Sequence, residues 1–205
     1  MFGIMDERRD WMSEEVTANM RFTWNQVECA EDESLLIEKA KAGNRSALGT
    51  LFEQHYPKLY GYLLKLTGNE QLAQDLTQET VTKAVIHLHT FRGKSKFQTW
   101  LFAIASNVVK NSYRKKQPVF LDELYIEVGD EGIEDQVVQR TQLRRLKLLL
   151  DQEKEVDRQI FLLKYYEGFD YDEISQITGV KVGTCKSKMH YMIERLRITM
   201  EGHDV

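Results

Sequence analysis

Cysteine and proline are scarce in this chain of 205 residues, and long apolar runs are lacking. Its two cysteines, Cys29 and Cys185, lie far apart and follow no pairing or zinc-ligand spacing, which argues for reduced thiols in a cytosolic protein. No apolar run approaches the roughly eighteen residues that cross a bilayer, and the acidic start lacks the basic-then-apolar order of a signal peptide. We therefore expect a soluble, cytoplasmic protein without membrane insertion.

Strand patterns are scarce as well. Proline occurs only at Pro57 and Pro118, and β-branched residues rarely alternate with polar ones, so the sequence favours helices throughout. One predicted helix runs from Ser46 toward Thr67, where Pro57 should bend it because proline removes a backbone donor. Asn69 is placed to cap the helix that follows. We expect an all-α protein of one or two small domains.

Charge is distributed in blocks along the chain, although the net charge is only −4. Residues 1–33 carry nine acidic and three basic side chains, whereas residues 34–116 carry thirteen basic and five acidic ones. Residues 117–139 are acidic again, and residues 141–205 are balanced. The net charge argues against a simple non-specific coat on nucleic acid, and the basic block predicts a polyanion site between segments that repel the same ligand.

The stretch from Phe91 to Lys116 combines a basic, aromatic loop with an amphipathic helix. The loop alternates cations with aromatic rings, a chemistry that grips single-stranded nucleic acid. Its residues are Phe91, Arg92, Lys94, Lys96 and Phe97. One helix side is predicted to be buried and carries Phe97, Leu101, Ile104, Ala105 and Val108. Another side carries Asn107, Lys110, Asn111 and Arg114, whose amides and cations suit base edges and phosphates. The alternative is an ordinary solvated basic face behind a polar loop.

The preceding predicted helix, residues 70–88, has a polar face of a different kind. Asp75, Gln78, Glu79 and Thr82 share one side, which is either solvated surface or a docking patch for a basic partner, and periodicity does not distinguish the two. His87 and His89 point in divergent directions on a helix and have no cysteine nearby, so we expect no metal site.

Residues 171–197 have the pattern of a helix-turn-helix. A short helix is followed by Gly179, which suits the positive φ of a tight turn, and then by a second helix with an apolar stripe that includes Cys185. The opposite face is polar and fits a recognition helix that enters the major groove. It carries Thr184, Lys186, Ser187, Lys188, His190, Tyr191 and Arg195. An ordinary helical hairpin remains the alternative.

Taken together, these motifs resemble the extracytoplasmic-function (ECF) sigma factors of bacterial RNA polymerase. Two blocks in the family's order carry the resemblance: DLTQET at residues 75–80 with the basic stretch after it, and YYEGFDYDEISQITGV with the helix after it, from Tyr165 to Arg197. The resemblance implies two small helical domains joined by a flexible acidic linker. The expected divisions are an acidic extension at 1–33, sigma region 2 at 34–116, the linker at 117–139 and sigma region 4 at 140–205.

The resemblance also implies roles for the polar faces. Asp75, Gln78, Glu79 and Thr82 are expected to bind core RNA polymerase. The minus-ten promoter element is expected to contact Phe91, Arg92, Lys94, Lys96, Phe97, Trp100, Asn107, Lys110, Asn111 and Arg114. The minus-thirty-five element is expected to contact Lys181, Thr184, Lys186, Ser187, Lys188, His190, Tyr191 and Arg195. The implied function is promoter recognition and strand opening for transcription initiation.

The implied partners are core polymerase, promoter DNA and an anti-sigma factor. We find no nucleophile, base and orienter grouping and no phosphate-cradling glycine loop, so we expect no enzymatic activity, cofactor or metal. The chain departs from the family at Gln98, Ser106 and Tyr191, where relatives often carry a base. A stand-alone helix-turn-helix regulator is the alternative function, in which the DLTQET face would be mere surface.

Overall fold

The computed structural model describes residues 32–115, 146, 149–150 and 152–201, and every described element is a helix. An all-α fold was predicted, and it is confirmed. The elements are α2 (Glu33–Lys41), α3 (Arg45–Thr67), α4 (Glu70–His87), the 3-10 turn η1 (Leu88–Thr90), α5 (Phe97–Lys115), α7 (Glu155–Tyr165), α8 (Tyr171–Thr178) and α9 (Val182–Glu201).

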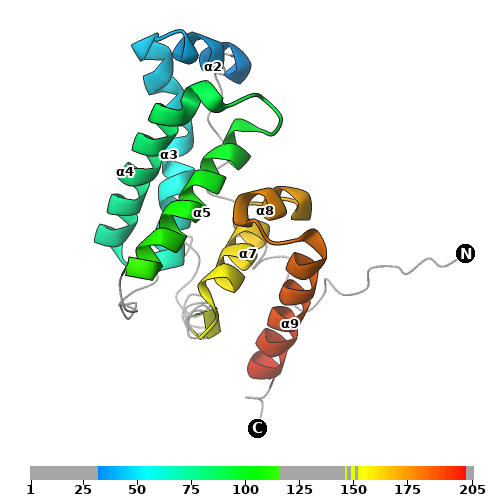
Figure 1. Ribbon diagram of the computed structural model, residues 1–205. Coiled ribbons are helices and arrows are strands. Elements are labelled where there is room, and N and C mark those ends of the chain that lie inside the picture. The colour runs from blue at the N-terminus through cyan, green and yellow to red at the C-terminus, as the bar shows by residue number, and fades with distance from the viewer. Residues whose placement is uncertain (1–31, 116–145, 147–148, 151, 202–205) are drawn as a thin grey trace, which may run out of the picture.

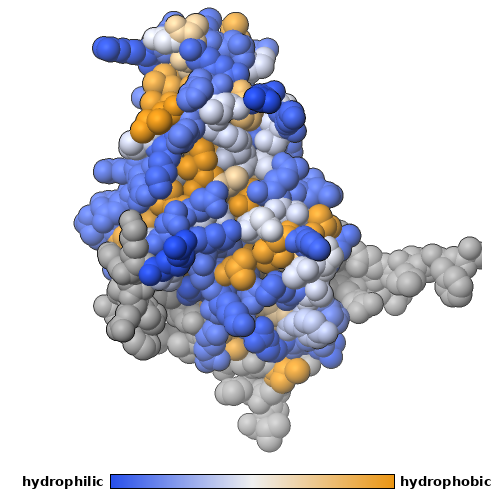
Figure 2. Space-filling model, in the orientation of Figure 1, coloured by the Kyte–Doolittle hydropathy of each residue, from blue (hydrophilic) through white to orange (hydrophobic). Residues whose placement is uncertain are grey.

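Helices α2 to α5 form the first module, in which α3, α4 and α5 pack side by side with α2 across one end (Figure 1). Their apolar stripes meet in a core that includes the fully buried Leu51, Tyr62, Leu63, Leu101 and Phe102. Hydrophilic residues predominate on the face shown in Figure 2, with smaller hydrophobic areas between them. This is the pattern of amphipathic helices that turn their apolar sides inward.

Short polar residues set the helix ends of this module. The side-chain oxygen of Asn44 accepts from the backbone N–H of Ala47, at 3.1 Å, where α3 begins. Asn69 caps α4 in the same way, as predicted, by accepting from the Leu72 N–H at 2.8 Å. Pro57 lies inside α3, which remains one continuous helix of 23 residues.

Helices α7, α8 and α9 form the second module. α8 begins with a capping box, in which Asp170 and Glu173 each accept from the other's backbone N–H. It ends at Gly179, whose φ of 74° is left-handed, as the sequence predicted for the turn between the two helices. The apolar stripe of α9, with Cys185 and Met189 buried, packs on α7 and α8.

The two modules also pack against each other, which the sequence analysis did not anticipate. α8 lies along α5, and α7 contacts α3 (Figure 1). The ring of Phe102 on α5 meets that of Phe169, just before α8, at a centroid distance of 5.1 Å. The predicted linker, residues 117–139, and residues 1–31 of the predicted extension lie outside the described residues. The last two residues of that extension belong to the described part, where Asp32 caps α2 and Glu33 begins it. In the described part, no helix is both long enough and apolar enough to cross a membrane.

Candidate nucleic-acid interface

The aromatic rings of the basic loop belong to the core of the first module. Phe91 is 7% exposed and Phe97 is 1% exposed, and their centroids lie 5.6 Å apart in an edge-on arrangement. Phe97 also contacts Phe52 and His55. In this arrangement the rings of Phe91 and Phe97 are not accessible to a nucleic-acid base, and their burial holds the loop in place. The burial of Phe97 agrees with its predicted position on the apolar side of the helix.

The remaining residues of the loop present charge to solvent. Arg92, Lys94 and Lys96 are exposed around Gly93, whose φ of 69° allows the sharp turn. Trp100 is half-buried against Phe91, with centroids 5.4 Å apart. The loop is thus a cationic rim around a buried aromatic cluster, and phosphate attraction is the chemistry that it offers.

The structure divides the predicted polar face of α5. Asn107, Asn111 and Arg114 are exposed, as a nucleic-acid surface requires. Lys110 is half-buried, and its Nζ donates to the carbonyl oxygen of Thr178 at the end of α8, at 2.5 Å. Three of the four side chains are therefore accessible in this arrangement, and the fourth joins the two modules.

On α4, the structure confirms one continuous exposed stripe and extends it. Asp75, Gln78, Glu79 and Thr82 are all exposed. The same spacing continues to Val85 and Ile86, which are 39% and 60% exposed. These two residues were not predicted, although they continue the stripe from Thr82 at i+3 and i+4. An acidic, amide-bearing stripe with an apolar end suits a partner helix that carries cations and apolar side chains.

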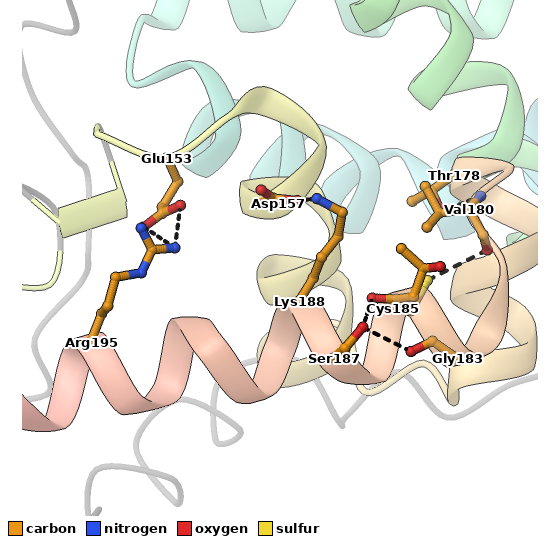
Figure 3. A network of polar contacts seen from close by, with 10 residues as sticks. Glu153, Asp157, Thr178, Val180, Gly183, Cys185, Ser187, Lys188 and Arg195 are labelled. Carbon is orange, nitrogen blue, oxygen red and sulfur yellow. Dashed lines mark hydrogen bonds and ion pairs between the residues drawn. The ribbon is translucent and has the colours of Figure 1, made fainter.

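On α9, two of the predicted recognition cations pair with carboxylates on α7 or just before it (Figure 3), and Arg195 remains 58% exposed. Lys188 Nζ lies 2.6 Å from a carboxylate oxygen of Asp157 on α7, and Arg195 lies 2.7 Å from Glu153, just before α7. Each cation crosses a helix interface to a carboxylate whose side chain is less than one-sixth exposed. In this structure, Lys188 and Arg195 therefore join α9 to α7 and to the residues just before it.

The other predicted residues of the recognition helix form an outward-facing surface. Tyr191 is 67% exposed, and Ser187 donates from its hydroxyl to the Gly183 and Thr184 carbonyl oxygens. Lys186 lies over the Tyr171 ring, 5.7 Å from its centroid. The exposed set is Lys181, Thr184, Lys186, Ser187, His190 and Tyr191. Hydroxyl, imidazole and ammonium groups at the N-terminal half of such a helix suit the edges and phosphates of a major groove.

Neither module presents a grouping typical of metal binding. Within the described residues, no three histidine, cysteine, aspartate or glutamate side chains gather closely enough to hold an ion. What the geometry defines is a two-module helical protein that has a helix-turn-helix, a cationic loop and a separate acidic docking stripe.

Comparisons with known proteins identify this class. The family model of sigma-70 region 2 matches residues 51–119, and that of sigma-70 region 4 matches residues 143–191. The RNA polymerase sigma-H factor of Pseudomonas aeruginosa is 30% identical over 171 residues, which cover 78% of this chain and 89% of that protein. The ECF RNA polymerase sigma factor SigW of Bacillus subtilis is 28% identical over 173 residues, covering 78% and 92%.

Solved structures show the same architecture. CnrH, in complex with the cytosolic domain of CnrY, matches with a TM-score of 0.63 at 20% identity, over 84% of this chain and 99% of that one. The sigma factor RpoE of Bartonella quintana, in complex with the anti-sigma factor NepR, matches with a TM-score of 0.61 at 25% identity, over 77% and 98%.

The chain belongs to the ECF sigma factors of RNA polymerase. It is an RNA polymerase sigma factor and not a stand-alone helix-turn-helix regulator, because it contains the region 2 module as well as region 4.

Proposed function

We propose that the α4 stripe binds core RNA polymerase, and that the other exposed surfaces divide promoter recognition between them. The observation that carries this proposal is the separation of the surfaces: the α4 stripe, the α5 face with its loop and the α9 face are all exposed on different helices. Separate surfaces allow one chain to hold the polymerase and two DNA elements together. The modules of this proposal are residues 34–116 and 140–205, and the family matches at 51–119 and 143–191 support this division.

At the minus-ten element, Arg92, Lys94 and Lys96 attract phosphates, and Asn107, Asn111 and Arg114 contact the opening strands. Phosphate contacts fix the register, whereas amide groups discriminate among bases. Unpairing a base costs roughly a few kcal/mol, and only contacts to the exposed base recover that cost for the right sequence. Sigma factors are initiation factors, so the catalysis belongs to the polymerase.

At the minus-thirty-five element, the exposed face of α9 enters the major groove. Lys181 and Lys186 contact phosphates, and Thr184, Ser187, His190 and Tyr191 offer their polar groups to base edges. Lys188 and Arg195 position the helix through Asp157 and Glu153.

A charge reversal tests the docking role of α4. The double substitution Asp75→Lys with Glu79→Lys should weaken binding to purified core polymerase by at least about tenfold, because like charges then face a basic partner. The matched control is Glu53→Lys with Glu70→Lys, which makes the same charge change at two exposed acids outside the stripe. Affinity is measured by titrating labelled sigma factor with core polymerase. Equal losses in both variants would refute the assignment.

We also propose an anti-sigma factor as a partner. The solved structures of CnrH and of the B. quintana sigma factor each contain a second protein, and the latter is described as an anti-sigma factor. In this proposal, the anti-sigma factor binds the exposed polymerase-binding and DNA-binding surfaces. Purification of the tagged chain from its native cell, with mass spectrometry of stoichiometric partners, tests this.

A further inference from the structure

Tyr191 on α9 carries the most exposed large hydrophobic side chain among the described residues, at 67%. Cys185, Met189 and Met192 of the same helix are buried where α9 packs on α7 and α8, and Tyr191 lies on the side away from this buried stripe. The neighbouring His190 ring lies 5.8 Å from it, centroid to centroid, at an interplanar angle of 52°. The ring of Tyr191 is therefore accessible to whatever this helix binds.

The residues one and two turns before Tyr191 on the same line of the helix are small. Gly183, Ser187 and Tyr191 follow each other at a spacing of four residues, which aligns them along one face of an α-helix. Gly183 and Ser187 are exposed, and a Cβ added at Gly183 would meet no atom within 4 Å. A base pair can therefore come close to the backbone of the first turns, and Tyr191 is the first bulky side chain that it meets along this line.

Ser187 presents a hydrogen-bond acceptor beside this ring. Its hydroxyl donates to the carbonyl oxygens of Gly183 and Thr184, each at 3.1 Å (Figure 3). Because its proton is engaged within the helix, Ser187 offers a ligand the lone pairs of its oxygen. In the major groove these lone pairs fit an amino group, which adenine presents at N6 and cytosine presents at N4.

The ring of Tyr191 distinguishes between these two bases. A phenol lacks the paired donors with which arginine reads guanine, so its main contribution to a groove is apolar surface. The 5-methyl group of thymine is the apolar group that base pairs present in the major groove. An A·T pair carries both the amino donor and the methyl group, whereas a G·C pair carries only the amino donor. Ser187 and Tyr191 together therefore match an A·T pair.

We propose that Tyr191 determines sequence specificity at the minus-thirty-five element, where its ring packs on the 5-methyl group of a thymine in an A·T pair. The inference rests on the proposed entry of α9 into the major groove and goes beyond it, since it names the base and the group that is read. Removal of both apolar surfaces from water stabilises the contact. The hydroxyl of Tyr191 takes no part in this discrimination.

Replacement of thymine by deoxyuridine tests the contact, because it removes the methyl group and leaves every hydrogen-bonding group of the base pair. The chain, assembled with core polymerase, first selects its minus-thirty-five element from a promoter library that is randomised there. Each thymine of the selected element is then replaced in turn, and affinity is measured by equilibrium competition. At the position that Tyr191 contacts, loss of the methyl group should weaken binding about fourfold, as expected for the burial of one methyl group.

Two variants separate the ring from the hydroxyl. Tyr191→Phe keeps the ring and should retain the fourfold preference for thymine at that position. Tyr191→Ser keeps a hydroxyl without the ring and should bind the thymine and deoxyuridine promoters equally. The matched control is Tyr56→Ser, which makes the same change at an exposed tyrosine of α3 outside the proposed DNA-binding surfaces and should leave the preference intact. Circular dichroism verifies that each variant keeps its helices.

Three results overturn the thymine contact: a selected element without a methyl-sensitive thymine, a preference that survives in Tyr191→Ser, or a preference that is lost in Tyr191→Phe. The entry of α9 into the groove has a separate readout in Lys186→Ala, which should weaken binding whether or not the thymine carries its methyl group. A loss of affinity in Lys186→Ala without any methyl effect overturns the thymine contact alone. Unchanged affinity in both Lys186→Ala and Tyr191→Ser overturns the groove assignment as well.

Discussion

Neighbouring cations on the recognition helix differ in what they bind, and their substitution should separate specificity from stability. Lys186 is exposed, whereas Lys188 is paired with Asp157 at 2.6 Å. We expect Lys186→Ala to weaken binding to a minus-thirty-five duplex and to reduce the slope of log affinity against log salt by about 1. We expect Lys188→Ala to leave that slope nearly unchanged and to lower the free energy of unfolding by about 0.5 to 1 kcal/mol.

Fluorescence anisotropy over a range of salt concentrations and urea unfolding measure these two effects. Asp157→Asn should reproduce the stability loss of Lys188→Ala without adding to it in the double variant, because both remove one interaction. A salt slope that falls equally for Lys186→Ala and Lys188→Ala would show that Lys188 leaves Asp157 to bind DNA.

Asn107 offers the second prediction at this scale. Its side chain is exposed on α5, so Asn107→Ala should change the free energy of unfolding by less than about 0.5 kcal/mol. It should weaken promoter opening more than polymerase binding, since the proposed role of this amide is contact with DNA alone. Permanganate reactivity of unpaired thymines measures opening, and equal losses of opening and polymerase binding would indicate a folding defect instead.

The sequence pattern assigned Phe97 both to the buried side of its helix and to the nucleic-acid loop, and it assigned Phe91 to the loop alone. An aromatic ring beside lysines is equally suited to stacking on a base and to filling a core, and the spacing of a loop does not distinguish the two. The structure places both rings in the core because α3 supplies Phe52 and His55 beside Phe97. That contact joins residues more than forty positions apart, which periodicity within one helix does not reveal.

At the scale of elements, the turn of the helix-turn-helix depends on one backbone conformation. Gly179 has a φ of 74°, and a Cβ added there would meet no atom within 4 Å. The cost of Gly179→Ala is therefore conformational and not steric, and we expect a loss of about 1 to 2 kcal/mol in the free energy of unfolding. Gly179→Asn should cost less, because asparagine tolerates the left-handed region. Chemical denaturation of both variants measures the difference, and equal costs would contradict the explanation.

Helices and their ends were predicted well, because their causes are local. Asn69, Gly179 and the stripe through Cys185 and Met189 act within a few residues of sequence, where capping geometry and the 3.6-residue period apply. The ion pairs of Lys188 and Arg195 were not predicted, since both cations lie on a polar face that the period marks as exposed. Only the position of α7 shows which of them meets a carboxylate.

At the scale of the molecule, one carboxyl group should make stability depend on pH. Glu167 follows α7, and Lys58 and Lys65 of α3 are its cationic neighbours; burial raises its pKa to about 7 from 4.5 despite them. A raised carboxyl pKa means that the folded form favours the protonated state. The protonated Glu167 side chain contributes at most about 3 kcal/mol to the free energy of unfolding. This contribution is fully present below pH 4.5 and is lost as the pH rises through 7.

The substitution Glu167→Gln should remove this dependence. Tyr62, Glu155 and Tyr166 are the other titratable groups at this junction, and all three have raised pKa values. Urea unfolding at pH 5.5 and pH 8 should show a larger loss for the wild type than for Glu167→Gln. Parallel losses in the two proteins would mean that Glu167 is hydrated in solution.

The contact between the modules is the feature furthest from prediction. Ser106 and Gln159 are small or polar and 53 positions apart, and neither looks like an interface residue in sequence. Polar groups of α3, α5, α7 and α8 meet across this interface, and no apolar stripe marks their positions in the sequence. Periodicity within single helices therefore does not show which surfaces of the two modules pack together.

A covalent tether changes how strong that contact has to be. Two modules on one chain meet at an effective concentration of about 1 mM. An interface with a dissociation constant of about 1 mM between separate modules is therefore formed in about half of the intact chains. Cutting the chain between residues 116 and 145 would then release each module from the other by dilution alone. An interface too weak to detect by mixing the separate halves can therefore still hold the two modules together within one chain.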